Sequence, residues 1–143
     1  MFLRVWLVNE TSFGGLGFLS KLFWPSAAAI WTAAVLALAL SPQVEQSWLL
    51  KTFGDKVLHG AAFTVGAVFW IRTIGLWPRL SFAGSLAAGS VAALIVGAAI
   101  EVFQSYVPGR TSDIRDLASD AAGVLLALLF LFAFPRARPR SSA

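Results

Sequence analysis

Residues Leu80 to Phe103 read LSFAGSLAAGSVAALIVGAAIEVF, and their only ionisable side chain is Glu101. A mostly apolar run of about 20 residues is the length that an α-helix needs to cross the hydrocarbon core of a bilayer. Small residues recur every fourth position, at Ser85, Gly89, Ala93 and Gly97. Small residues let helix backbones approach closely in lipid, so this face is predicted to pack inside a bundle. Glu101 is the next member of the series and should face the same interior.

The composition of the whole chain agrees with a membrane protein. Hydrophobic residues make up 58% of the 143 residues, charged residues 13%, and the mean hydropathy is +0.77. Soluble domains carry roughly 25% charged residues. The apolar blocks are continuous and rich in Ala, Leu and Gly, whereas strands of a membrane barrel alternate polar and apolar positions. The sequence therefore predicts an all-α fold, a four-transmembrane-helix bundle with an interfacial N-terminal stretch.

Four apolar blocks are expected to form the helices, and Pro or Gly residues mark their ends. The blocks are Phe23 to Leu40, Val57 to Trp77, Leu80 to Phe103 and Leu117 to Phe134. We expect three parts: an interfacial segment at 1–22, a four-helix domain at 23–134 and a basic cytoplasmic tail at 135–143.

The positions of Lys and Arg predict the orientation, because cytoplasmic segments accumulate these residues. With four helices, both termini and the middle loop share one side. Of the eleven Lys and Arg residues, seven fall on that side and four on the other; the seven are Arg4, Lys21, Arg72, Arg79, Arg136, Arg138 and Arg140. Both termini are therefore predicted to be cytoplasmic.

Polar residues gather in two runs that this topology brings to the outer side. One run begins the second helix, and the other covers the end of the third helix, a loop and the start of the fourth. The candidate site residues in these runs are Asp55, Lys56, His59, Glu101, Gln104, Arg110, Asp113, Asp116 and Asp120. Charged groups at the edge of a membrane are costly unless they are paired or face water, so they mark a candidate functional site.

These runs carry a resemblance to a known family. The patterns Asp55-Lys56-x-x-His59-x-x-x-Phe63 and Glu101-x-x-Gln104, followed by Pro108-Gly109-Arg110, Asp113, Asp116 and Gly123, resemble the VanZ-like family of small bacterial membrane proteins. The resemblance covers Asp55 to Gly123 and implies a multi-pass protein of the bacterial cytoplasmic membrane that works on the cell envelope. This chain has Asp120 where the family usually has Asn.

Each polar residue also has a purely structural interpretation. Asp55 is a candidate helix N-cap, with Lys56 extending its side chain to the interface. His59, the only His, needs a polar partner, and Asp55 or Glu101 can supply it.

The residues of the second run have structural alternatives as well. Asp113 and Asp116 fit an acidic variant of the capping box at the start of the fourth helix. Arg110 either pairs with Glu101 or Asp116, or leaves its guanidinium for a phosphate or carboxylate on a ligand.

No specific catalytic motif is found in the sequence, and we expect no cofactor, no metal site and no nucleic-acid partner. Two non-enzymatic functions compete. In the first, the cluster binds the headgroup of an envelope lipid or a lipid-linked cell-wall precursor. In the second, the cluster only braces helix ends, and the protein is an accessory subunit that docks onto a larger membrane complex. Membrane lipids are partners in both, and Trp31, well inside the first helix, is expected to face them.

Overall fold

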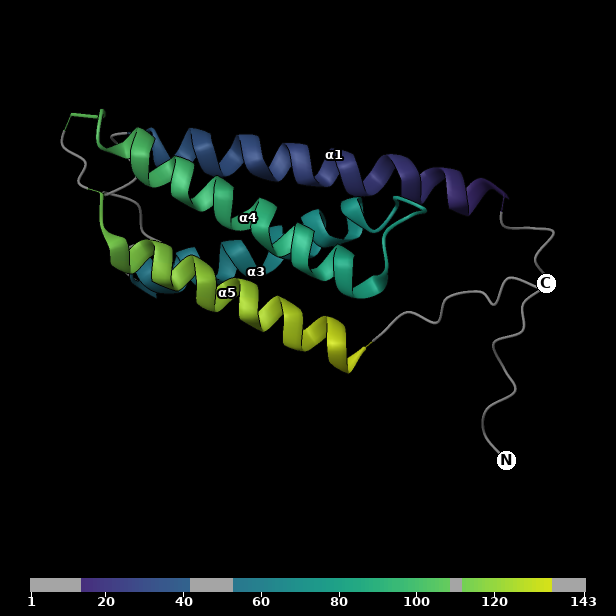
Figure 1. Cartoon of the computed structure of the whole chain (residues 1–143). Coiled ribbons are helices and arrows are strands. Elements are labelled where there is room, and N and C mark those ends of the chain that lie inside the picture. The colour runs from purple at the N-terminus through teal and green to yellow at the C-terminus, as the bar shows by residue number, and fades with distance from the viewer. Residues whose placement is uncertain (1–13, 42–52, 109–111, 135–143) are drawn as a thin grey trace.

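The structure is a computed structural model that describes residues 14–41, 53–108 and 112–134 (Figure 1). All four helices in these ranges are long and apolar enough to cross a membrane. They are α1 (Gly14–Ala39), α3 (Asp55–Ile74), α4 (Phe82–Gln104) and α5 (Ile114–Ala133). No strand occurs within the described ranges, and the predicted all-α four-helix fold is confirmed.

The helix boundaries differ from the expected ones by a few residues, except at the start of α1. This helix begins at Gly14 rather than Phe23 and continues through Pro25. Residues 14–22, expected to be interfacial, therefore extend the first helix, while residues 1–13 and the basic tail lie outside the described residues. Membrane helices tolerate an internal Pro because neighbouring groups re-satisfy the freed backbone carbonyl.

The helices run antiparallel along the chain, so their ends alternate between the two ends of the bundle (Figure 1). The C-terminal ends of α1 and α4 lie together with the N-terminal ends of α3 and α5. This end, which we call the polar end, carries the described members of both polar runs. Helix α3 is central: it packs on α5 most extensively and also on α4 and α1. Helix α5 packs against α4 as well.

The small-residue face of α4 is buried, as predicted. Ser85, Gly89, Ala93 and Gly97 have little or no exposed surface, and Glu101 is only 7% exposed. At Gly89 the backbone of α3 comes so close that an added Cβ would lie 2.4 Å from the Cα of Ile71. Close backbone approach of this kind provides much of the packing energy between helices in lipid.

Helices α3 and α5 meet at a second pair of glycines. A Cβ on Gly123 would lie 2.2 Å from the carbonyl oxygen of Gly60. The Thr64 hydroxyl shares its one proton between the carbonyls of Gly60, at 2.8 Å, and Gly123, at 3.1 Å, and so links the two backbones. The contact lies beside the polar end and fixes how closely α5 approaches α3.

Trp31 faces the bundle, and the expectation that it faces lipid is wrong. It is 9% exposed, and its indole Nε1 donates to the carbonyl of Ala62 at 3.1 Å. Its ring packs edge-on against Phe63 and occupies the space that a side chain at Gly66 would fill. Hydropathy alone does not show this, because the room for the indole is made by a glycine on another helix.

The close approach at Gly123 leads to a first prediction. Gly123→Ala should lower the free energy of unfolding by about 1 to 3 kcal/mol, the usual cost of overpacking, because the added methyl meets backbone atoms that cannot rotate away. Unfolding of the purified protein in mixed micelles, followed by circular dichroism, measures the change.

Gly60→Ala is the matched control. A Cβ at Gly60 meets only the Ser119 carbonyl oxygen at 3.5 Å, an ordinary van der Waals contact. This variant should be as stable as the wild type or slightly more stable, since Ala favours the helix. Equal stability of the Gly123→Ala and Gly60→Ala variants would contradict the proposed packing.

Candidate functional site

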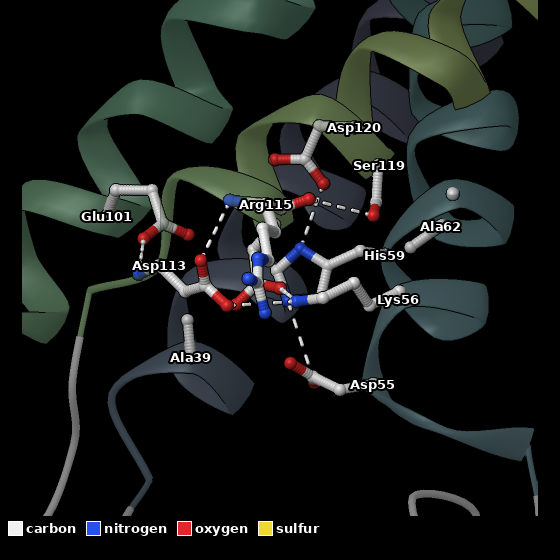
Figure 2. Close-up of polar contacts among 12 residues, drawn as sticks. Ala39, Asp55, Lys56, His59, Ala62, Glu101, Asp113, Arg115, Ser119 and Asp120 are labelled. Carbon is white, nitrogen blue, oxygen red and sulfur yellow. Dashed lines mark hydrogen bonds and ion pairs between the residues drawn. The ribbon is translucent and has the colours of Figure 1, made fainter.

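The polar end is layered from exposed to buried. The side chains of Asp55, Lys56 and Asp113 are about half exposed and form the rim. Below them lie Asp116, which is buried, and Asp120, which has no exposed surface. The site thus reaches from the bundle surface into its core, through residues of α3 and α5 (Figure 2).

His59 joins α3 to α5 at the centre of the site. Its Nδ1 lies 2.9 Å from Oδ1 of Asp120, and its Nε2 lies 3.8 Å from Oδ1 of Asp55, one helical turn earlier. Figure 2 shows the imidazole between these two carboxylates. The spacing had indicated the Asp55 contact, but the closer partner is Asp120, and the alternative of Glu101 is not observed among the described contacts.

The Asp120 carboxylate fits because α4 presents a glycine to it. A Cβ at Gly97 would lie 2.6 Å from Oδ2 of Asp120. This oxygen has no hydrogen-bond partner among the described residues. A buried carboxylate depends on its partners for stability, so His59 provides the principal compensation for the Asp120 charge.

Lys56 ties the rim together. Its Nζ donates to Asp113 Oδ2 at 3.1 Å and also to Asp116 Oδ1. The interpretation of Lys56 as a side chain that merely reaches the interface is therefore wrong. The suggested N-cap role of Asp55 is also wrong, because the cap position is Gly54, whose φ of 77° suits glycine, and no side chain caps this helix.

Glu101 and Asp113 together build the start of α5. The Asp113 side chain accepts from the Arg115 backbone N–H at 2.9 Å, which confirms its predicted N-cap role. Asp116 does not complete a capping box, because its carboxylate bonds Lys56 instead. Glu101 of α4 takes that place: its Oε2 accepts from the Asp113 backbone N–H at 2.9 Å and from the Ser112 hydroxyl at 3.0 Å.

Gln104 binds a different helix end. Its Nε2 donates to the carbonyl of Ala39 at 3.4 Å, so a buried side chain of α4 satisfies one of the last carbonyls of α1. The last four carbonyls of a helix have no partner within the helix. This contact makes α1 the fourth helix that meets at the polar end.

Arg110 lies outside the described residues. Its pairing with Glu101 or Asp116, or with a ligand, stays a prediction.

Carboxylates outnumber cations in the described part of the site. The acidic groups are Asp55, Glu101, Asp113, Asp116 and Asp120, and the basic ones are Lys56, Arg115 and, when protonated, His59. The Arg115 backbone N–H, followed by the Lys56 ammonium, holds the pKa of Asp113 below its usual value. The site as described therefore attracts cations and hydrogen-bond donors.

Comparison of the chain with protein-family models, with curated proteins and with solved structures finds no match.

The structure brings the described candidate residues together at the polar end, but the sequence did not indicate two of their connections. Ser112 was not recognised as a partner of Glu101, and Asp120 was not recognised as the partner of His59. One signal was available for Asp120: it lies four residues after Asp116, so both project from one side of α5.

The role of Glu101 gives a second prediction. Glu101→Ala should lower the free energy of unfolding by about 1 to 3 kcal/mol, because the Asp113 backbone N–H and the Ser112 hydroxyl lose their acceptor. Glu101→Gln keeps an acceptor oxygen and should lose less. Denaturant unfolding in micelles compares the two variants; if both match the wild type, Glu101 does not hold the start of α5.

The lowered pKa of Asp113 gives a third prediction. A carboxyl group whose pKa is lower in the folded state stabilises the protein above its unfolded pKa, near 3.8, and this stabilisation disappears as the pH falls through the folded value. Asp113→Asn keeps a good N-cap but removes the titrating charge.

Thermal unfolding of both proteins as a function of pH tests this prediction. The stability advantage of the wild type over Asp113→Asn should be constant at neutral pH and shrink on acidification below the unfolded pKa. A difference that is independent of pH would show that the Asp113 charge is not stabilised by the fold.

Proposed function

We propose that the protein is a VanZ-like integral membrane protein of the bacterial cytoplasmic membrane that binds an envelope headgroup at its polar end. The headgroup belongs to an envelope lipid or a lipid-linked cell-wall precursor. In this proposal both termini are cytoplasmic, in line with the Lys and Arg distribution, and the polar end faces outward.

One observation carries the proposal: the polar groups are continuous from a half-exposed rim to a fully buried floor. Asp55 and Lys56 present charged groups to the headgroup layer. Below them, Asp116 pairs with Lys56. Asp120 bonds Nδ1 of His59, and Nε2 of the same ring faces Asp55. Binding sites combine a few well-positioned polar groups in this way.

Apolar residues next to the rim suit the acyl chains of a lipid. Phe53, Val57, Phe103, Tyr106 and Ile114 are all about half or more exposed, and they adjoin the polar residues in the sequence. Amphipathic aromatic side chains, such as that of Tyr106, prefer the level of the headgroups. A lipid seated here would place its chains along these residues and its headgroup over the rim.

The charge balance of the described site indicates which class of headgroup it favours. Carboxylates accept hydrogen bonds from sugar hydroxyls and from ammonium groups, and they repel phosphate. The excess of carboxylates in the described site therefore favours a glycosyl or ammonium headgroup over a purely anionic one. In this proposal Arg110 contributes the contact to any phosphate that such a ligand carries.

Lipid-dependent stability gives a fourth prediction. In detergent, a glucosyl diacylglycerol or phosphatidylethanolamine should raise the unfolding temperature more than phosphatidylglycerol does. Asp55→Asn should weaken the binding of the favoured lipids about 10-fold, the effect of losing one charge-assisted hydrogen bond. Native mass spectrometry measures the binding directly.

Arg79→Ala is the control, because Arg79 is exposed and lies between α3 and α4 at the opposite end. This variant should bind the favoured lipids as the wild type does. A preference for phosphatidylglycerol, or unchanged binding by Asp55→Asn, would contradict the proposal. Co-purification in fixed stoichiometry with a larger complex, without lipid selectivity, would favour the accessory-subunit alternative.

A further inference from the structure

One residue at the rim, Asp55, and two below it, His59 and Asp116, form a group that could hold a metal ion. One carboxylate oxygen of Asp55, one of Asp116 and a ring nitrogen of His59 all lie within 4.8 Å of one another. Two ligands of one Zn²⁺ ion, each about 2.0 to 2.2 Å from it, are separated by roughly 3.5 Å in a tetrahedral site. Nε2 of His59 and Oδ1 of Asp55 are 3.8 Å apart, close to this separation, and the half-exposed Asp55 side chain in the first turn of α3 has room to adjust.

The orientation of His59 independently points to a ligand. Metal-binding histidines commonly donate their second ring N–H to a carboxylate, which fixes the tautomer and increases the basicity of the ligating nitrogen. Here Nδ1 is held at 2.9 Å by Asp120, a carboxylate with no exposed surface. The other ring nitrogen, Nε2, therefore faces Asp55 at the rim.

The buried carboxyl group of Asp120 is a further observation that favours a cation. Asp120 is fully buried, and its Oδ2 has no hydrogen-bond partner among the described residues. Lys56 is already shared between Asp113 and Asp116. A divalent ion on Nε2 of His59 would add positive charge on the far side of the imidazole, where it stabilises the Asp120 carboxylate through the ring.

We propose that Asp55, His59 and Asp116 bind a divalent transition-metal ion, with Zn²⁺ as the best match. One imidazole nitrogen and two carboxylate oxygens are ligands that zinc accepts, and a three-residue site leaves a fourth position open to water or a ligand. Asp120 positions His59 and does not touch the ion. Lys56 competes with the ion for Asp116. The site takes the ion whether or not a lipid headgroup binds.

The single His of the chain makes the test specific. In tag-free protein labelled with ¹⁵N-histidine, every imidazole signal comes from His59. Titration with Zn²⁺ alone, in detergent without added lipid, should shift the Nε2 resonance in a saturable way. Nδ1 should keep its bonded proton. Asp55→Asn should weaken Zn²⁺ binding at least 10-fold, and its position at a half-exposed rim leaves the fold intact.

Two further variants separate a metal site from a general attraction of cations. Asp120→Asn should weaken binding by about 10- to 100-fold, the usual effect of changing the partner of a metal-binding histidine. Lys56→Met should strengthen it, because the competing ammonium is removed, and Arg79→Ala should leave it unchanged. No saturable shift in the wild type, a shift at Nδ1 in place of Nε2, or a shift that Asp55→Asn does not alter would each overturn the proposal.

Discussion

The hydrogen bond between His59 and Asp120 places a carboxylate with no exposed surface inside a helix that is apolar enough to cross a membrane. Such a group is costly to bury unless it is paired. His59 and Asp120 can pair only if α3 and α5 keep a fixed rotation and a fixed axial position relative to each other. Gly97 leaves room for the carboxylate, and the contact between Gly123 and Gly60 brings the backbones near enough for the bond to form.

The remaining polar contacts follow from this fixed arrangement. With α5 held against α3, Lys56 reaches both Asp113 and Asp116. Glu101 meets the start of α5 from α4, and Gln104 holds the end of α1. The carboxylates at the rim are therefore held in position by helix packing.

The fold was largely predictable because each helix is encoded locally. Continuous apolar runs predicted the four helices, and the four-residue repeat of small residues predicted the buried face of α4 that ends at Glu101. The capping role of Asp113 was also local, since the cap and its partner Arg115 are two residues apart.

The contacts between helices were less predictable, because they depend on how helices far apart in the sequence are rotated against each other. The spacing within one helix indicated Asp55 as a neighbour of His59, but nothing local identified Asp120 on α5 as the closer partner. Trp31 was assigned to lipid for the same reason: the space for its ring is created by Gly66 of α3.

A double-mutant cycle between His59 and Asp120 tests the central claim most directly. The free energy of unfolding is measured in micelles for the wild type, His59→Ala, Asp120→Ala and the double variant. The structure predicts a stabilising coupling energy of at least about 1 kcal/mol, in the upper part of the range for hydrogen bonds between membrane helices. A coupling energy near zero, with additive losses, would contradict a polar end organised by this pair.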